Sequence, residues 1–249
     1  MKGNTASKSV PIILPFVYED LVRRELAVDL GVAGDITTDA IVDDDLGATA
    51  HVVARQDGRG CGLSCCLFTF EVLGGVVHRA RRGDGEDVTT GSVLAELQGP
   101  ARSLLSAERT ALNILGHLSG IASVTRDLVR LVGEVGHARV VCTRKTTPGL
   151  RALEKYAVRV GGALNHRFGL YDAVLIKDNH RVAAGGIRSA VAAVRAAMGH
   201  VVKLEVEVDT LEQLAEIKRI PIEVAEDTVV LNADDPLVLA MAEHAKAKH

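Results

Sequence analysis

The chain has 249 residues, of which 47% are hydrophobic and 3% aromatic, and it contains no Trp. This length suffices for one large α/β domain or two smaller ones. A core with so few aromatic rings must be built from Val, Leu, Ile and Ala, which suits parallel strands buried on both faces. The formal net charge of −3 gives no general argument for a nucleic-acid or anionic-membrane partner. No apolar run approaches the length of a membrane span.

The four cysteines, Cys61, Cys65, Cys66 and Cys142, are too few for the disulfide framework of a small secreted domain. We therefore expect reduced thiols in a cytoplasmic protein. The first three could bind a metal, but no second Cys or His pair stands at zinc spacing, and buried small apolar side chains are the better interpretation. The first ten residues carry two lysines and lead into a short apolar stretch, which argues against a signal peptide or anchor.

The first hundred residues predict a mixed α+β region. Apolar residues recur at helical spacing over 16–28, residues 48–54 alternate as in a strand, and residues 83–99 form a glycine-bounded turn with a short strand. A cluster of aspartates in this region is expected to lie on a solvated surface: Asp35, Asp39, Asp43, Asp44 and Asp45.

After residue 101 the pattern changes to a long helix over 103–118, followed by alternating strands and helices. Such units imply parallel strands joined by right-handed crossovers, in a barrel or in an open doubly wound sheet. The predicted strands are 139–142, 173–176, 203–208 and 228–231, and the helices that follow them are 151–160, 187–198, 211–217 and 237–246.

Polar side chains lie within or just after each of these strands, which favours the barrel. Because the carboxyl ends of parallel strands gather around one site, we expect these groups to converge. In chain order they are Thr143, Arg144, Lys145, Lys177, Asp178, Asn179, His180, Glu205, Glu207 and Asn232.

Residues 139–181 concentrate positive charge, with nine Lys or Arg against three Asp or Glu, a formal +6 in a chain that is −3 overall. This field indicates a small anionic ligand, because an Arg fork donates two parallel hydrogen bonds to a carboxylate or phosphate. Arg151 and Lys155 are more simply explained as solvated charges on the exposed face of a helix. The cations that we expect to converge are Arg144, Lys145, His166, Arg167 and Lys177.

Lys203, Glu205 and Glu207 alternate along one predicted strand and therefore share a face. The two carboxylates could hold Mg²⁺ bridged to phosphate oxygens or offset positive charge on a sugar carbon, although a structural ion pair is an equal alternative for Glu205. No glycine-rich loop of the dinucleotide or Walker type is present. The Gly-Arg-Gly run around Arg59 is discounted because no predicted strand and helix frame it.

Several runs of the sequence resemble quinolinate phosphoribosyltransferase, the carboxylating nicotinate-nucleotide pyrophosphorylase family. They occur in the family's order between residues 18 and 236: AGDITT at 33–38, ARSLLSAERTALN at 101–113, LSGIAS at 118–123, CTRKTTPGLRALEKY at 142–156, NHRFGLYDAVLIKDNH at 165–180 and EVEVDT at 205–210. A phosphoribosyltransferase-like protein of molybdenum transport shares the fold. It is a poorer match, because this chain keeps HRFGLYD and IKDNH intact.

The resemblance implies an N-terminal open-faced α/β sandwich, placed at residues 1–112, and an incomplete α/β barrel of fewer than eight strands, placed at 113–249. It also implies a homodimer in which the N-terminal domain of one subunit covers the barrel mouth of the other. Mapped by motif, the quinolinate contacts would be Thr143, Arg144, His166, Arg167 and Lys177, with Arg102 from the partner subunit. Lys145 would contact substrate or pyrophosphate, and Glu207 would face the ribose and Mg²⁺.

The implied reaction joins quinolinate to the ribose of phosphoribosyl pyrophosphate and releases pyrophosphate and carbon dioxide, which gives nicotinate mononucleotide for NAD biosynthesis. Pyrophosphate would leave on Mg²⁺, and no other cofactor is required. Carboxylates near the sugar would offset its positive charge while cations hold the anionic groups in line.

The sequence departs from the family at two places. Asn232 stands where the family has a catalytic Asp, and an amide cannot supply that negative charge. Asp234 and Asp235 lie just beyond, but a shift of two residues moves a group by about 7 Å along an extended chain. The family's last two strands, whose backbone N–H groups bind the ribose phosphate, have no counterpart. Either the sequence is incomplete or this variant has given up full activity.

Two other functions stay open at this point. A non-catalytic homologue would bind quinolinate or a similar dicarboxylate without turning it over, and Asn232 favours that hypothesis. A basic surface for RNA would show a steep salt dependence of binding, but the shortage of aromatic side chains for base stacking argues against it.

Overall fold

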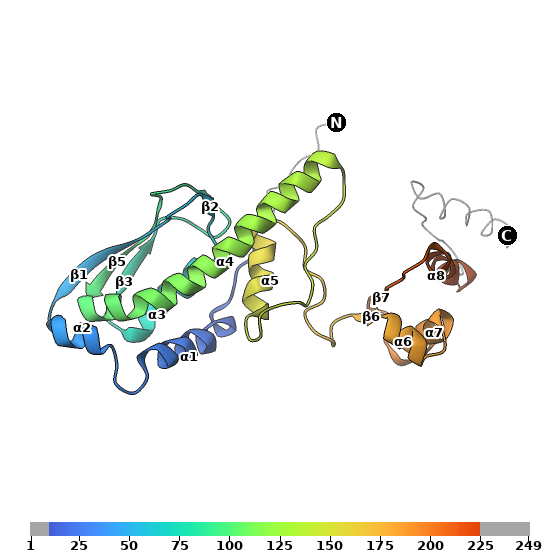
Figure 1. The fold of residues 1–249 in the computed structure, drawn as a ribbon, viewed down its shortest axis with the longest axis horizontal. Helices are drawn as coiled ribbons and strands as arrows, with labels where there is room; N and C mark the ends of the chain where they lie inside the picture. Colours follow the sequence, from blue (N-terminus) through green and yellow to red (C-terminus); the bar gives the residue numbers. More distant parts are fainter. Residues whose placement is uncertain (1–9, 225–249) are drawn as a thin grey trace. The chain divides into compact units, whose positions relative to one another are not determined.

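The computed structural model describes residues 10–224, and it divides into two compact units between Phe168 and Gly169 (Figure 1). The first unit contains η1 (Pro15–Val17), α1 (Glu19–Leu30), α2 (Ile36–Ile41), β1 (Gly47–Val53), β2 (Gly58–Arg59), α3 (Leu63–Leu73), β3 (Val77–Ala80), β4 (Asp87–Val88), β5 (Val93–Pro100), α4 (Ala101–Val135) and α5 (Arg151–Val160). The second contains β6 (Val174–Ile176), α6 (Asp178–Ala183), α7 (Ile187–Ala197), β7 (Leu204–Val206) and α8 (Leu211–Val224).

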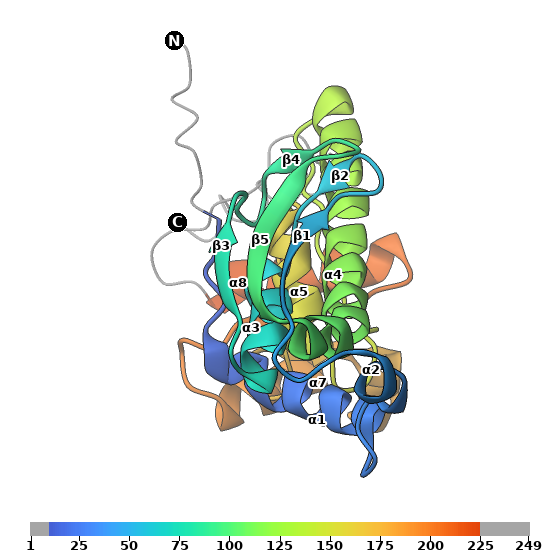
Figure 2. The same ribbon diagram turned by 90° about the vertical axis from the view of Figure 1, so that its left-hand side faces the viewer.

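An antiparallel sheet of β1, β5 and β3, in that order, dominates the start of the first unit. Ala48, Ala50 and Val52 of β1 point toward the core, where α3 and α4 cover this face of the sheet (Figure 2). Thr49 and His51 point the other way and are exposed, because successive side chains alternate across a strand. The open-faced α/β sandwich expected from the sequence is therefore confirmed.

The long helix α4 connects this sheet to the rest of the first unit. The sequence predicts a helix over 103–118, but α4 runs from Ala101 to Val135, so that the expected domain boundary at residue 112 lies inside it. Its buried residues recur three or four positions apart, as an amphipathic helix requires. The first of them pack on the sheet, whereas Leu118 and Ala122 pack against α1 and α5.

Helix α3 was not predicted, because its first turns are Cys-rich and apolar all round rather than periodic. The thiols of Cys61, Cys65 and Cys66 are free and have no exposed surface, which confirms that they act as small buried side chains. Burial raises the pKa of the Cys65 and Cys66 thiols to about 12. Within residues 10–224, no group of three His, Cys, Asp or Glu side chains is placed to hold a metal ion.

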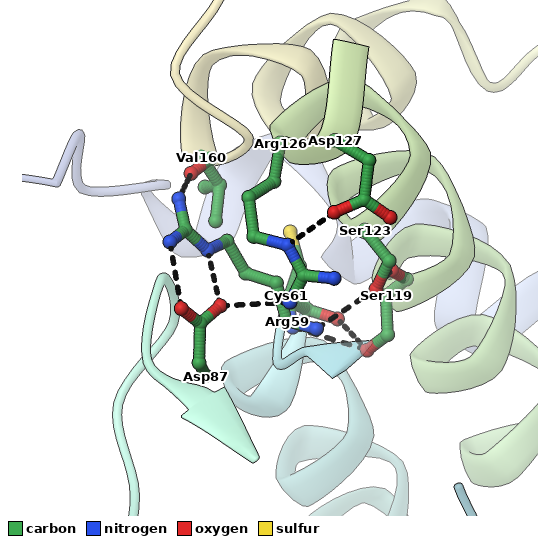
Figure 3. A network of polar contacts seen from close by, with 8 residues as sticks. All are labelled: Arg59, Cys61, Asp87, Ser119, Ser123, Arg126, Asp127 and Val160. Carbon is green, nitrogen blue, oxygen red and sulfur yellow. Dashed lines mark hydrogen bonds and ion pairs between the residues drawn. The ribbon is translucent and has the colours of Figure 1, made fainter. Parts of the chain in front are cut away.

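Arg59 has a structural role. The expectation that no strand or helix lies beside its Gly-Arg-Gly run is wrong, because β2 includes Gly58 and Arg59 and α3 begins at Leu63. Its guanidinium donates to both carboxylate oxygens of Asp87, at 3.0 and 3.2 Å, and to the Val160 carbonyl at 3.4 Å (Figure 3). Its backbone N–H donates to Ser123 Oγ at 2.8 Å, and Arg126 of α4 also binds Asp87, at 2.9 Å. These contacts tie the two-stranded β2–β4 sheet to α4 and to the end of α5.

The aspartate cluster is only partly a solvated surface. Asp35 caps α2, since its carboxylate accepts from the Thr38 backbone N–H at 3.0 Å and from Ser106 Oγ at 3.1 Å. The hydrogen bonds from Thr38, and then that from Ser106, hold the pKa of Asp35 below its ordinary value. For this residue the expectation of a solvated side chain is wrong.

In the second unit, β6 and β7 pair in parallel and pack with α7 around Ile176, Ile187 and Val191. The predicted strands 173–176 and 203–208 and the helices between and after them are confirmed, whereas the predicted strand 228–231 and helix 237–246 lie outside the described residues. The α/β class is confirmed, and no closed barrel occurs within the described part of the chain. No helix there is long and apolar enough to cross a bilayer.

Helix α5 packs so closely on α4 that only glycine fits at residue 161. A Cβ added there would lie 2.5 Å from Thr125 Cβ and 2.8 Å from the backbone oxygen of Ala122. We predict that Gly161→Ala lowers the free energy of unfolding by about 1–3 kcal/mol, because a backbone atom cannot move aside as a side chain can.

Gly120→Ala, on a part of α4 where an added Cβ meets nothing within 4 Å, is the matched control. It should raise the free energy of unfolding by up to about 1 kcal/mol, the difference in helix propensity. Urea denaturation of the two variants measures both effects, and equal stabilities would contradict the proposed contact.

Candidate active site

Two chain segments carry most of the predicted cations of the first unit, and they run side by side in parallel. Val141 forms a parallel bridge with Leu164, and the Cys142 backbone N–H donates to the Leu164 carbonyl at 3.0 Å. The predicted strand 139–142 is therefore wrong in extent, because it is reduced to this single bridge. The two segments nevertheless leave the bridge in the same direction, so that residues 143–145 and 165–167 emerge from the same end of the pair.

Arg144 is half-buried, and part of its guanidinium group is buried without a hydrogen bond to any described residue. Its Nε atom is buried, yet it has no hydrogen-bond partner among the described residues. Thr143 and Lys145 on either side are exposed, and the Lys145 backbone N–H donates to Thr143 Oγ1 at 3.1 Å. A buried guanidinium nitrogen without a partner is costly, so Arg144 is suited to receive an anion.

The second segment places His166 and Arg167 beside this loop, both half-buried. Arg144, Lys145, His166 and Arg167 thus follow the two bridged residues on neighbouring segments, and their convergence on one anion site stays a prediction.

The interpretation of Arg151 and Lys155 as solvated helix charges is wrong. Lys155 has no exposed surface, and its Nζ donates to Cys142 Sγ at 3.0 Å and to the His166 carbonyl at 2.9 Å. Arg151 donates to Thr146 Oγ1 at 3.1 Å and to the Phe168 carbonyl at 3.2 Å. The polar face of α5 therefore points at the two cation-bearing segments rather than at solvent.

Glu154, also on α5, holds the loop after Lys145. Its carboxylate accepts from the Thr147 backbone N–H at 3.1 Å and contacts His117 Nε2 of α4 at 3.0 Å. Burial by itself would raise the pKa of Glu154, but the hydrogen bonds from Thr147 and His117 outweigh it and hold the pKa below its ordinary value. The carboxylate form is therefore part of the fold at neutral pH.

In the second unit, Lys177 and Glu207 lie at the same edge of the β6–β7 pair. Ile176 is in register with Val206, and the Glu207 N–H donates to the Ile176 carbonyl at 2.8 Å, so that Lys177 and Glu207 directly follow the paired residues. Both are exposed. The predicted alternation is also confirmed, since Lys203, Glu205 and Glu207 are exposed while the residues between them are half-buried.

The segment after Lys177 forms the short helix α6, which the sequence did not predict. His180 Nδ1 accepts from the Lys177 backbone N–H at 3.0 Å and so fixes the start of that helix. Arg181 is buried, with hydrogen bonds of 2.6 Å to Gln213 and to Asp209, and therefore serves the fold of this unit. The capping role of His180 could have been inferred from its position three residues after Lys177.

The remaining candidates lie elsewhere. Asn232 lies outside the described residues. Arg102 is held by its own chain: it donates to the Val42 carbonyl at 2.8 Å and pairs with Asp39 at 3.4 Å and with Asp44. Two helical turns further along α4, the exposed Arg109 makes no ion pair among the described residues.

Arg109 lines a groove of about 480 Å³ between α1, α4 and residues 148–153. The polar residues of this groove are Arg24, Glu25, Asp29, Arg109, Thr110, Asn113 and His117. Sequence reasoning missed Arg109, although it stands in the same ARSLLSAERTALN run as Arg102.

Two family models cover most of the chain. The model described as quinolinate phosphoribosyl transferase, N-terminal domain, matches residues 35–119, and the C-terminal domain of the same enzyme matches residues 121–247. The chain belongs to the quinolinate phosphoribosyltransferase family. The resemblance inferred from the sequence motifs is thereby confirmed.

Curated members of the family are similar over most of their length. The chain is 47% identical over 197 residues to the probable nicotinate-nucleotide pyrophosphorylase (carboxylating) of Bacillus subtilis and 48% identical over 198 residues to the nicotinate-nucleotide pyrophosphorylase (carboxylating) of Mycobacterium leprae. These matches cover 79% and 78% of this chain, and 67% and 69% of the two relatives.

Solved structures of the family share the fold. NadC from Streptococcus pyogenes superposes with a TM-score of 0.80 at 40% identity, over 84% of this chain and 74% of that one. The nicotinate-nucleotide pyrophosphorylase from Francisella tularensis gives 0.76 at 34% identity, over 96% and 91%.

The lowered pKa of Glu154 predicts how its contribution to stability depends on pH. Because the folded-state pKa lies below the ordinary value of 4.5, the ionised carboxylate stabilises the fold above that pH, and this stabilisation is lost as the pH falls through the folded pKa. We expect Glu154→Gln to be less stable than the parent by about 1–2 kcal/mol at pH 7. Urea unfolding at several pH values should show this gap closing in acid, and a gap independent of pH would contradict the assignment.

Proposed function

We propose that this chain joins quinolinate to the ribose of phosphoribosyl pyrophosphate and releases pyrophosphate and carbon dioxide, which yields nicotinate mononucleotide in de novo NAD biosynthesis. The observation that supports the proposal is the parallel bridge between Val141 and Leu164, because the segments that bear Arg144, His166 and Arg167 leave it in the same direction. Quinolinate has two adjacent carboxylates on a flat ring. Planar guanidinium groups bind such carboxylates with two parallel hydrogen bonds, whereas a lysine acts as a compact charge.

Each cation has a role in the proposal. Arg144, His166, Arg167 and Lys177 bind the two carboxylates of quinolinate, and Thr143 offers a hydroxyl at the exposed edge of the loop. Lys145, which is exposed, contacts substrate or the pyrophosphate group. This cluster holds the pyridine nitrogen in line with the ribose carbon that it attacks, so that binding energy is spent on orientation.

The first step forms a bond between the pyridine nitrogen and the ribose C1 carbon as the bond from C1 to pyrophosphate breaks. Positive charge develops on the sugar in between, and the Glu207 carboxylate offsets it. The ribosylated ring nitrogen is then cationic. As carbon dioxide leaves, the electron pair of the carbon–carboxylate bond stays on the adjacent ring carbon, where the positive charge of the nitrogen stabilises it, and a proton then binds to that carbon.

Mg²⁺ fits the two carboxylates at β7. Glu205 of β7 and Glu207 directly after it are both exposed, and Mg²⁺ typically takes one or two protein carboxylates together with substrate phosphates. Glu207 would hold the ion, which when bound neutralises charge on the departing pyrophosphate. The family's Asp position is Asn232 in this chain, so Glu207 is the carboxylate on which this role depends.

We predict that the chain binds quinolinate. Arg144→Ala and Lys177→Ala should each weaken binding by at least about 100-fold, because the first loses a charge-assisted bidentate contact and the second loses an ion pair with a ligand carboxylate. The thermal unfolding midpoint of both variants should stay close to that of the parent, because neither side chain makes a hydrogen bond or ion pair among the described residues. Isothermal titration calorimetry measures the affinity.

A coupled assay for nicotinate mononucleotide then separates an enzyme from a binding protein. Formation of product from phosphoribosyl pyrophosphate supports the proposal. Tight binding of quinolinate without product would identify a non-catalytic homologue instead. Parent affinity in both variants would remove the site assignment.

We also propose a homodimer in the cytoplasm, where four free thiols are expected to stay reduced. In this dimer Arg102 of one subunit reaches the quinolinate site of the other. Its contacts with Val42, Asp39 and Asp44 of its own chain compete with that role, and Arg109 is the alternative donor on the same helix. Mixed dimers distinguish the two arginines, because binding is restored only for the variant of the arginine that acts on the neighbouring subunit.

If Arg102 acts on the neighbouring subunit, mixing Arg102→Ala with Lys177→Ala subunits should restore quinolinate binding, because one site in each mixed dimer then has every contact. Arg109→Ala mixed with Lys177→Ala is the parallel experiment. Rescue of the Arg109 variant alone would transfer the role to Arg109, and rescue of neither would place both residues outside the neighbouring site.

A further inference from the structure

Among residues 10–168, Lys155 is the one buried cation, and the proposed reaction leaves it without a role. It has no exposed surface and is the largest fully buried side chain among the described residues. Its Nζ atom lies 3.0 Å from Cys142 Sγ, 2.9 Å from the His166 carbonyl and 5.1 Å from the centre of the Phe168 ring. One ammonium group therefore contacts both segments that carry the quinolinate-binding cations.

These two segments have little backbone pairing of their own. Beyond the bridge between Val141 and Leu164, the nearest direct link is the contact of 3.4 Å from Cys142 Sγ to Asn165 Oδ1. A regular pair of parallel strands would continue with backbone hydrogen bonds beyond this bridge. Here the hydrogen bonds of the Lys155 ammonium to Cys142 and His166 link the two segments instead. Cys142 is two residues before Arg144, and His166 is itself a candidate ligand, so a shift of either segment moves the binding groups.

The neighbours of Lys155 on α5 act on the same loops. Arg151, Glu154 and Lys155 stand at positions i, i+3 and i+4, which share one face of a helix. Arg151 donates hydrogen bonds to the Thr146 hydroxyl and the Phe168 carbonyl, and Glu154 accepts one from the Thr147 N–H. Arg151 and Lys155 therefore each link the two segments. Lys155 does so next to the Val141–Leu164 bridge, at Cys142 and His166, whereas Arg151 does so further along, at Thr146 and Phe168.

The charge of Lys155 is not compensated locally. Within residues 10–224, no carboxylate forms an ion pair with Lys155, and Glu154 beside it is directed at Thr147 and His117. Burying such a charge is expensive, and a neutral side chain of similar length would fill the same space at lower cost. A lysine there adds positive potential behind the anion site as well as holding its walls.

We propose that Lys155 is a positioning residue for the quinolinate site: it fixes the segments bearing Arg144 and His166 at the spacing that a dicarboxylate requires. The inference rests on the proposed function for the identity of the ligand. The clamp itself is independent of that function, and the experiment separates the two.

The experiment compares Lys155→Met, which keeps the apolar stem but removes the ammonium, with Lys155→Arg, which keeps a charged donor in a different shape. Tyr156→Phe is the matched control on α5. It removes one part-buried hydrogen bond, the 2.7 Å contact from Tyr156 Oη to Asp84, and touches neither segment.

Hydrogen–deuterium exchange of the full chain without ligand is the first measurement. In Lys155→Met, the amides of residues 142–147 and 164–168 should exchange at least about tenfold faster than in the parent, while the β1–β5–β3 sheet is unchanged. Lys155→Arg should lie between the two, and Tyr156→Phe should stay within about twofold of the parent in both segments. If Lys155→Met does not fold, the intermediate change in Lys155→Arg decides.

Calorimetric titration with quinolinate is the second measurement, with an expected loss of affinity of about tenfold or more in Lys155→Met and a smaller loss in Lys155→Arg. Unchanged exchange in both Lys155 variants, or an equal change in Tyr156→Phe, would overturn the clamp. Faster exchange in the two segments with unchanged quinolinate affinity would overturn its role in binding. A parent chain that binds no quinolinate would refute the proposed function, while the exchange data would still decide on the clamp.

Discussion

The first unit depends on the close packing of α5 against α4. At Gly161 the two helices approach until a single methyl group would overlap the backbone of Ala122. Leu118 of α4 and Leu153 and Ala157 of α5 fill the space between the helices. Because α5 also carries the side chains that hold residues 142–147 and 164–168, any movement of this helix would be passed to the cations on those segments.

The sequence predicts the local structure best where one periodicity dominates. The bounds of α5 follow from its apolar spacing, β6 follows from a short apolar run, and β7 lies within the alternating residues 203–208. Helix α3 was missed because a helix that is buried on nearly all sides shows no polar face. The strand at 139–142 was overestimated because β-branched residues favour extended backbone, whereas the length of a ladder depends on a partner that is distant in the sequence.

The side chains that support residues 142–147 and 164–168 were not predicted from the sequence. The grouping of Arg144, His166 and Arg167 rests on the convergence of parallel strand ends, and it stays a prediction. No pattern shows which face of an amphipathic helix meets solvent when the neighbouring surface is itself polar. Arg151 and Lys155 have the spacing of an exposed charged face, and only the position of the loops beside α5 shows that this face is buried.

Lysines illustrate how burial decides the role of one residue type. Lys145 is exposed beside a predicted anion site of the first unit, and Lys177 is exposed in the second unit; a mobile, hydrated ammonium in such a position can meet a ligand at little cost. Lys155 has already lost its water, and its donors are committed to a thiol and a carbonyl, so it is poorly placed to bind substrate directly. Its contacts with the thiol, the carbonyl and the Phe168 ring exist before any ligand arrives. In the proposal, exposed lysines therefore meet the ligand while Lys155 orders the segments beneath the site, and a preorganised site needs both.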